Sequence, residues 1–121
     1  MSNIIVLIED DEDIGNIIKY KLDQEGFKIF WLRDGIEGLS SIQDQLPDLV
    51  ILDIMIPKLD GLHVLKKLKS ANDTQYIPVL ILTALSQEQD MIKAFKYGAD
   101  DYLTKPFRTE ELIMRVKKIL M

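Results

Sequence analysis

Short apolar runs alternate along the chain with segments whose apolar residues recur every three or four positions. Three continuous runs rich in Ile and Val cover residues 4–8, 49–52 and 79–82, and weaker runs cover residues 27–32 and 101–104. Continuous apolar runs of this length are typical of strands that are covered on both faces. We therefore expect five short strands.

Helical spacing predicts five helices, one after each strand. Their apolar positions are Ile14, Ile17, Ile18 and Leu22; Leu39, Ile42 and Leu46; Val64, Leu65 and Leu68; Met91, Ile92 and Phe95; and Leu112, Ile113, Val116, Ile119 and Leu120. We expect the first helix to end at Gly26 and the second to end before Pro47. Ser86 and Gln89 have the spacing of a capping box at the start of the fourth helix, and the fifth is expected to begin near Thr109.

Strict alternation of strand and helix favours an α/β fold in which a parallel sheet carries helices on both faces. Right-handed crossovers leave few windings of such a sheet, and among them we choose the strand order 2-1-3-4-5. The expected architecture is a (βα)5, doubly wound, five-stranded parallel sheet in a three-layer sandwich. A chain of 121 residues should form it as one domain over residues 1–121.

The composition narrows the set of partners. The 15 Lys and Arg against 20 Asp and Glu give a net charge of −5, which disfavours direct contact with nucleic acid. Without cysteine, the chain has neither disulfides nor thiolate metal sites. The longest aliphatic run, residues 4–8, is far shorter than the roughly 20 apolar residues of a membrane helix, and the first residues do not resemble a basic-then-apolar leader. We therefore expect a cytoplasmic protein without membrane contact.

Polar residues stand at the ends of four of the predicted strands. Glu9 and Asp10 follow the first strand, Asp53 follows the third, Thr83 follows the fourth, and Lys105 follows the fifth. Because the strands are expected to be parallel, these groups should meet at one edge of the sheet. The chosen strand order places Glu9 and Asp10 opposite Asp53.

Three neighbouring carboxylates need a compensating cation, because each close pair repels by about 4 kcal/mol at an effective dielectric constant near 20. Hard carboxylate oxygens suit Mg²⁺, with Mn²⁺ as the alternative. Asp53 has apolar residues on both sides, so its backbone is anchored while its side chain reaches the rim. A carboxylate held in this way can attack phosphorus to form an acyl phosphate, with Lys105 and Thr83 pairing with phosphoryl oxygens. This edge of the sheet therefore predicts phosphoryl transfer.

Each of these residues also has a purely structural interpretation. Acidic residues after a strand often cap the next helix, and we expect Asp11 or Asp13 to do so. Taken alone, Asp53 is more often a turn residue than a nucleophile. His63, the single histidine, is expected to be a solvated helix residue. The hypothesis of a site depends on several compatible groups reaching one edge together.

Four motifs carry a resemblance to a known family. They are Ile8-Glu9-Asp10-Asp11, the segment DLVILDIMIPKLDG at residues 48–61, Leu82-Thr83-Ala84, and the segment GADDYLTKPF at residues 98–107. With these motifs the chain resembles the receiver domains of bacterial two-component response regulators, over essentially all of its 121 residues. The resemblance implies a flavodoxin-like, CheY-like fold, which is the architecture expected above.

The resemblance also implies a role for each residue of the site. Asp53 is implied to be the phosphoacceptor. The implied ligands of Mg²⁺ are Glu9, Asp10, Asp53 and the backbone carbonyl of Met55. The implied phosphate-binding and switch residues are Thr83, Ala84, Lys105 and Tyr102. The bond before Pro106 is implied to be cis, which the general frequency of about 5–6% for such bonds would not suggest.

A sensor histidine kinase is the partner that the resemblance implies as the source of the phosphoryl group. The domain is then a signal transducer and not an enzyme, and it catalyses only its own phosphorylation and dephosphorylation. Phosphorylation is expected to draw Thr83 toward the phosphoryl group and to move Tyr102 inward. The surface of the fourth helix, fifth strand and fifth helix then changes as a population shift between two packings.

The last third of the chain most resembles the OmpR-type class, in which a receiver precedes a winged-helix DNA-binding domain. In that class this surface pairs two copies after phosphorylation, and Asp101, Glu111 and Arg115 stand at matching positions. Met91 departs from the pattern, because a basic residue usually faces Glu111 there. The 121 residues contain no effector domain, and we expect a fragment of a longer regulator rather than a stand-alone receiver.

Three other functions fit parts of the pattern. A phosphohydrolase of the haloacid dehalogenase type needs a second acid two residues after its nucleophile, where this chain has Met55. An FMN carrier of the same fold needs a Ser/Thr/Gly-rich phosphate loop after the first strand, where Glu9, Asp10 and Asp11 would repel phosphate. An interaction module independent of phosphorylation stays open. Uptake of a phosphoryl group from a small donor with Mg²⁺ separates that module from a receiver.

Overall fold

The computed structural model describes residues 3–84 and 88–121, and its sheet has five parallel strands. The strands are β1 (Ile4–Ile8), β2 (Lys28–Leu32), β3 (Leu49–Asp53), β4 (Val79–Ala84) and β5 (Asp101–Lys105). Their order in the sheet is β2-β1-β3-β4-β5, and every neighbouring pair is parallel. The predicted α/β class, parallel sheet and strand order are therefore confirmed.

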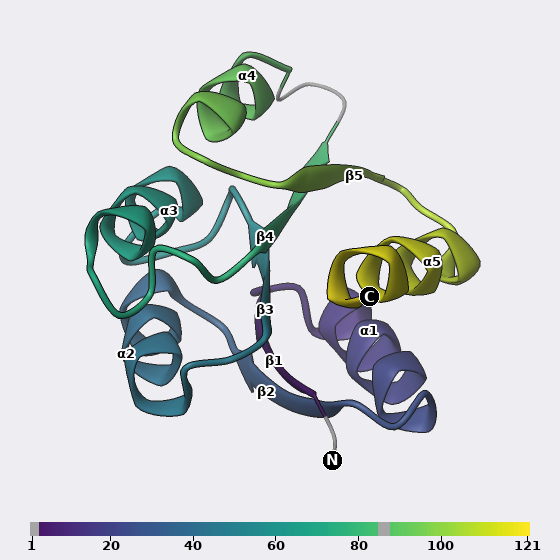
Figure 1. The fold of residues 1–121 in the computed structure, drawn as a ribbon. Coiled ribbons are helices and arrows are strands. Elements are labelled where there is room, and N and C mark those ends of the chain that lie inside the picture. The colour runs from purple at the N-terminus through teal and green to yellow at the C-terminus, as the bar shows by residue number, and fades with distance from the viewer. Residues whose placement is uncertain (1–2, 85–87) are drawn as a thin grey trace.

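Five helices cover the two faces of this sheet. They are α1 (Glu12–Gln24), α2 (Gly35–Gln45), α3 (Gly61–Ser70), α4 (Glu88–Lys96) and α5 (Thr109–Leu120). Figure 1 shows α1 and α5 together on one face and α2, α3 and α4 on the other. The result is the three-layer sandwich that the alternating pattern predicts.

Alternate residues of each strand feed two separate cores. On β1, Val6 and Ile8 belong to the core beneath α2, α3 and α4, whereas Ile5 and Leu7 belong to the core beneath α1 and α5. All four side chains are fully buried. Because side chains alternate across a strand, burial on both faces requires the continuous apolar runs seen in the sequence.

Aspartates at the strand-to-helix turns start three of the helices. The side chains of Asp11, Asp34 and Asp60 accept hydrogen bonds from backbone N–H groups in the first turns of α1, α2 and α3. The prediction that Asp11 or Asp13 caps the first helix is confirmed for Asp11. The predicted capping box at Ser86 lies outside the described residues.

The end of α2 differs from the prediction. Leu46, expected on the apolar face of the helix, is instead its C-cap, with a left-handed backbone (φ 45°) and a half-exposed side chain. The residue before a proline is disfavoured in the helical region, and Pro47 follows directly, so the helix stops one residue early.

Among the described helices, none is long and apolar enough to cross a membrane.

Candidate functional site

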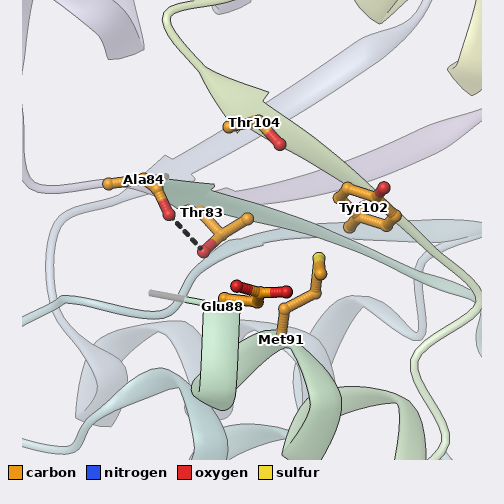
Figure 2. A pocket seen from close by; sticks show the side chains of 6 residues that line it. All are labelled: Thr83, Ala84, Glu88, Met91, Tyr102 and Thr104. Carbon is orange, nitrogen blue, oxygen red and sulfur yellow. Dashed lines mark hydrogen bonds between the residues drawn. The ribbon is translucent and has the colours of Figure 1, made fainter. Parts of the chain in front are cut away.

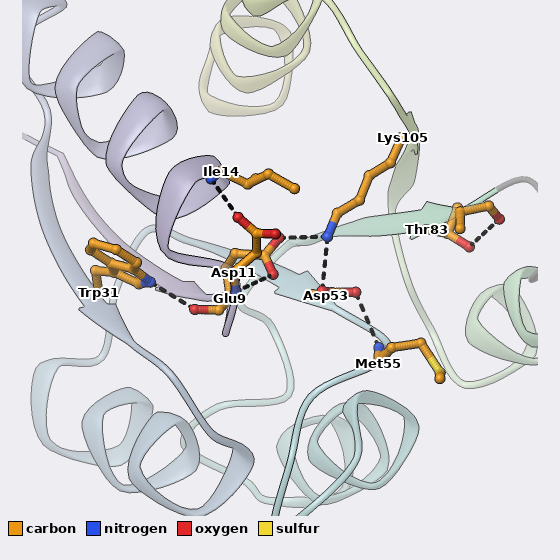
Figure 3. A network of polar contacts seen from close by, with 9 residues as sticks. Glu9, Asp11, Ile14, Trp31, Asp53, Met55, Thr83 and Lys105 are labelled. Atoms are coloured by element: carbon orange, nitrogen blue, oxygen red, sulfur yellow. Dashed lines mark hydrogen bonds and ion pairs between the residues drawn. The ribbon is translucent and has the colours of Figure 1, made fainter.

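Four strands bring the predicted site residues to the carboxyl edge of the sheet. Asp53 is the last residue of β3 and Lys105 is the last residue of β5, while Thr83 lies one residue before the end of β4. Glu9 comes directly after β1. Figure 3 shows Glu9, Asp53 and Lys105 converging there, with Thr83 to one side. Strands β3, β4 and β5 thus extend one or two residues beyond the apolar runs that predicted them.

Three carboxylates form the centre of the site. Glu9, Asp10 and Asp53 each offer one oxygen, and these oxygens all lie within 4.8 Å of one another. Glu9 is fully buried and Asp53 is 5% exposed, while Asp10 is exposed to solvent. Hard oxygen donors in this number suit Mg²⁺, which is commonly held by a few carboxylates together with phosphate oxygens and water. The donor set therefore fits a divalent cation at this position.

Lys105, expected at the same edge of the sheet, lies beside the carboxylates. Its Nζ lies 2.7 Å from Glu9 Oε1 and 2.9 Å from Asp53 Oδ2. Only the contact with Asp53 has hydrogen-bond geometry, so Glu9 Oε1 keeps no hydrogen-bond donor of its own among the described residues. Burial acts to lower the pKa of Lys105, but pairing with Glu9 and Asp53 outweighs it and raises that pKa. Lys105 is therefore held protonated at the centre of the acidic cluster.

Glu9 has an unusual carboxyl group. Burial, followed by the neighbouring Asp53, raises the pKa of Glu9 from its ordinary 4.5 to about 7, although Lys105 and the Asp11 N–H act in the opposite direction. Removing a carboxylate from water disfavours its charged form. At pH 7 the Glu9 carboxyl of the metal-free protein is thus close to half protonated, and a bound divalent cation would favour its ionised form.

Asp53 is fixed by its backbone and by both carboxylate oxygens. Its Oδ1 accepts a hydrogen bond from the Met55 N–H at 3.1 Å, and its Oδ2 accepts one from Lys105. One Asp53 oxygen thus makes a contact typical of a turn residue, and the other lies against Lys105 in the acidic cluster. Met55 carries its own side chain outward, 60% exposed.

Gly61 is a contributor that the residue-by-residue prediction missed. Its N–H donates to the Ile54 carbonyl at 2.9 Å, and a Cβ at this position would lie 2.5 Å from the Asp53 carbonyl oxygen. Real Cβ atoms do not approach so closely, so only glycine lets the start of α3 pack against the end of β3. The signal was present as the Asp60-Gly61 pair closing the longest motif.

A cavity of about 250 Å³ lies between α4 and the ends of β4 and β5 (Figure 2). It is lined by Thr83, Ala84, Glu88, Met91, Tyr102 and Thr104. The buried Thr83 hydroxyl donates to the Ala84 carbonyl at 3.2 Å. Tyr102 packs edge-on against Phe95 of α4, with ring centroids 5.7 Å apart. Thr83 and Tyr102, the two residues expected to move, therefore line the same small cavity. The Lys105–Pro106 bond is cis, as the resemblance implied.

The charged residues expected at an interface between copies are paired within one chain. Arg115 Nη1 donates to both Asp101 oxygens at 2.9 Å, and Arg115 Nη2 donates to Glu111 at 3.1 Å. Both contacts, led by the one with Asp101, raise the pKa of Arg115. An Asp101–Arg115 pair between two copies would have to replace this internal pair. His63, as predicted, is a solvated helix residue, and it pairs with Asp60.

Comparisons with known proteins agree with this geometry. The family described as response regulator receiver domain matches residues 5–117. The chain is 45% identical to the DNA-binding dual master transcriptional regulator RpaA of Synechocystis sp. over 116 residues, covering 96% of this chain and 48% of that protein. It is 40% identical to the alkaline phosphatase synthesis transcriptional regulatory protein PhoP of Bacillus subtilis over 120 residues, covering 99% of this chain and 49% of that protein. The chain thus spans about half the length of these curated relatives.

Solved structures give the same result for the fold. A putative response regulator from Chloroflexus aurantiacus superposes with a TM-score of 0.94 at 33% identity, covering 99% of this chain and 98% of that chain. The chemotaxis response regulator CheY4 of Vibrio cholerae superposes with a TM-score of 0.93 at 23% identity, covering 99% of this chain and all of that chain. At that lower identity, the second likeness supports the fold alone.

Proposed function

This chain belongs to the response regulator receiver domain family, whose members are phosphorylated on an aspartate, and from that membership we propose that Asp53 is the phosphoacceptor. The domain is a signal transducer of a two-component system. One observation carries the assignment of the residue: Asp53 ends β3 with Lys105 Nζ 2.9 Å from one oxygen and with carboxylate oxygens of Glu9 and Asp10 within 4.8 Å. Those are the charges that phosphoryl transfer to a carboxylate requires.

A divalent cation belongs beside Asp53 in this proposal. Glu9, Asp10 and Asp53, together with the backbone carbonyl of Met55, would hold Mg²⁺, with Mn²⁺ as the alternative. When bound, the ion supplies positive charge that offsets the charge on the transferring phosphoryl group. The buried carboxyl of Glu9 would be fully ionised when it holds the ion, because a nearby positive charge favours the ionised form.

The phosphoryl group comes from a phosphohistidine of a sensor kinase. A carboxylate oxygen of Asp53 attacks the phosphorus, a P–O bond forms, and the P–N bond breaks with its electron pair returning to the imidazole ring. Lys105, already 2.9 Å from Asp53, moves its ion pair from the carboxylates to a phosphoryl oxygen. Because β3 and α3 hold the Asp53 backbone, the nucleophile needs little reorganisation.

The switch uses the cavity beside the site. Thr83 gives up its hydrogen bond to the Ala84 carbonyl and donates to a phosphoryl oxygen instead. Ala84 is small enough to leave room for that group. Tyr102, which lines the cavity of about 250 Å³, then moves into the space that Thr83 leaves. The phosphoryl group thereby shifts the population toward a second packing of α4, β5 and α5.

The aspartyl phosphate is removed by water in the same site. The domain thus catalyses its own dephosphorylation as well as its own phosphorylation. Met55 places an exposed apolar side chain two residues after the phosphoacceptor, where no polar atom of that side chain can orient an attacking water. We therefore expect a phosphorylated lifetime longer than seconds.

The whole protein acts as a cytoplasmic transcription regulator with a winged-helix output domain. RpaA and PhoP are named as transcriptional regulators, and this chain matches about half of each. The receiver contacts neither nucleic acid nor membrane.

Phosphorylation pairs two receivers through α4, β5 and α5. Asp101, Glu111 and Arg115 then replace their internal ion pairs with ion pairs between the two copies. Sedimentation with and without a phosphoryl mimic tests this step, and a monomer in both states would contradict it.

Incubation with Mg²⁺ and a small acyl phosphate, followed by intact mass measurement, tests the proposed function. The native protein should gain one phosphoryl group, and Asp53→Asn should gain none. Omitting the cation should suppress the gain. If the folded native protein gains no phosphoryl group with Mg²⁺ present, the chain is an interaction module independent of phosphorylation.

A further inference from the structure

Both backbone polar groups of Glu9, the N–H and the carbonyl, form hydrogen bonds with residues of the neighbouring strand β2. Its N–H donates to the Leu32 carbonyl at 3.0 Å, which continues the strand pairing one residue past β1. Its carbonyl accepts a hydrogen bond from the Trp31 indole N–H at 2.8 Å. Figure 3 shows this indole reaching the Glu9 carbonyl from the side opposite Lys105. A side chain of an edge strand therefore fixes the first residue of the acidic cluster.

The fold makes a recess for this indole. A Cβ at Gly15 of α1 would lie 1.9 Å from Trp31 Cζ2, so the ring occupies space that only glycine leaves open. The guanidinium of Arg33 covers the ring at 4.7 Å, and Arg33 also approaches Glu12 at 3.8 Å. The ring is half-buried, and it is the only tryptophan in the chain. Gly15 of α1 and the side chain of Arg33 thus both fix the position of the ring.

The backbone of Glu9 determines where two carboxylates point. The Glu9 side chain is fully buried, with Oε2 accepting the Asp11 N–H at 3.2 Å, and Asp10 follows directly in the chain. Without the indole donor, the Glu9 carbonyl loses its only described partner, and the peptide plane between Glu9 and Asp10 is held less firmly. Groups that orient ligand residues affect metal affinity even when they do not touch the ion.

We propose that Trp31 is a positioning residue of the cation site, acting through the backbone of Glu9. The inference rests on the proposed function, because it concerns the same carboxylates. It adds a residue from β2, a strand that contributes no ligand.

Calorimetric titration of Mg²⁺ into native protein, Trp31→Phe and Phe30→Leu tests the proposal. Trp31→Phe keeps a ring but removes the donor, and it should weaken Mg²⁺ binding by about 10-fold, at the low end of the 10–100-fold range for such partners. Phe30 packs in the other core, beneath α2, α3 and α4, so Phe30→Leu should lower thermal stability while leaving Mg²⁺ affinity within about 2-fold. Equal weakening in both variants, or native affinity in folded Trp31→Phe, would overturn the proposal.

Gly15→Ala gives a second variant that keeps the indole. Alanine favours the helix by about 1 kcal/mol over glycine, but its Cβ would displace the ring. The single indole N–H signal in the NMR spectrum should be protected from solvent exchange in native protein, and it should shift during Mg²⁺ titration. In Gly15→Ala it should lose protection as Mg²⁺ affinity falls. Lost protection with native Mg²⁺ affinity would count against the proposal.

Failure of this inference is distinguishable from failure of the proposed function. If native protein and Trp31→Phe bind Mg²⁺ and take up a phosphoryl group equally well, only the role of Trp31 is refuted. Native protein that binds no Mg²⁺ refutes both the cation site and the inference built on it.

Discussion

Two groups of acidic residues share the carboxyl edge of this sheet, and they differ in what stabilises their charge. The cap carboxylates, Asp11, Asp34 and Asp60, each accept a backbone N–H at the start of a helix. The site carboxylates, Glu9, Asp10 and Asp53, crowd within 4.8 Å of one another. The cap carboxylates therefore stabilise the fold, whereas the negative charges of the site carboxylates are stable together only when positive charge lies beside them.

The pKa values show the difference directly. The Glu37 N–H is the main cause that lowers the pKa of Asp34. Burial raises the pKa of Asp60, but its hydrogen bonds with His63 outweigh burial and the net pKa is lowered. Burial instead raises the pKa of Glu9 to about 7. Helix N-termini favour negative charge, and a buried cluster of carboxylates disfavours it. Acidic residues at the same edge of the sheet thus serve opposite purposes.

The largest effect should come from Asp10→Asn, which removes one site carboxylate without altering the buried core. One negative charge about 4 Å from a divalent cation corresponds to about 2 kcal/mol in water and to about 8 kcal/mol at an effective dielectric constant near 20. Asp10 is exposed to solvent, so its contribution lies toward the lower of these values. We expect Mg²⁺ affinity, measured by calorimetry, to fall about 100-fold. The matched change Asp60→Asn, at a cap, should leave it within about 2-fold. Equal losses would erase the distinction between the two groups.

The second largest effect should come from replacing a lysine. One lysine contacts the site carboxylates and another contacts a cap carboxylate, and we expect their replacement to have different consequences. Lys105 lies between Glu9 and Asp53, and Lys58 lies 3.5 Å from Asp34 with its side chain 61% exposed. Lys105→Ala should abolish the chemical-shift change of Thr83 and Tyr102 on addition of a phosphoryl mimic. Phosphoryl uptake should fall less, within about 10-fold, because the cation still offsets charge. Lys58→Ala should alter neither, since exposed ion pairs contribute only about 0–1 kcal/mol.

Glu9→Gln should stabilise the metal-free protein at high pH. Because folding raises the pKa of Glu9 from 4.5 to about 7, its contribution to stability is complete below pH 4.5 and is lost as pH rises through 7. At pH 8, Glu9→Gln should exceed native protein in free energy of unfolding by about 2–3 kcal/mol, and the gain should vanish near pH 4. Denaturant titrations across pH measure this difference.

The sign should reverse for a cap carboxylate. The pKa of Asp60 is lowered, so its stabilisation is present above its ordinary pKa of 3.8 and lost as pH falls through the folded value. Asp60→Asn should therefore not stabilise the protein at pH 8. A gain there equal to that of Glu9→Gln would show that the raised pKa of Glu9 has no special structural cause.

Asp34→Ala should have the smallest effect. Removing the cap of α2 should lower the free energy of unfolding by about 1 kcal/mol, and Asp34→Asn, which keeps a capping oxygen, should restore most of it. Mg²⁺ affinity should not change in either variant. A loss of Mg²⁺ binding in Asp34→Ala would mean that the cap and the site are coupled.

Much of this arrangement could be predicted from the sequence, because it depends on strand ends. Ile and Val runs located the strands, and parallel winding brought Glu9, Asp53 and Lys105 to one edge. The sequence pattern identified only Asp11 as a cap carboxylate. It did not predict the same role for Asp34 and Asp60. Whether an acid caps a helix or joins the cluster depends on the direction of its turn, and spacing along the chain does not encode that direction.

Contacts between distant side chains also escaped the pattern. The hydrogen bond from Trp31 to Glu9 spans 22 positions and needs the recess at Gly15. The internal pairing of Arg115 with Asp101 depends on how α5 packs beside β5. The role of Gly61 follows from a close approach of two backbones. Each of these features arises from packing geometry rather than from local periodicity.

Locating the phosphoryl group in the native protein tests the central claim most directly. After incubation with Mg²⁺ and an acyl phosphate, hydride reduction converts the labelled aspartate to homoserine, and peptide mapping identifies its position. The account predicts a single labelled residue, Asp53, with the cap carboxylates unlabelled. Label at Asp10, at Asp34 or spread over several acids would contradict it.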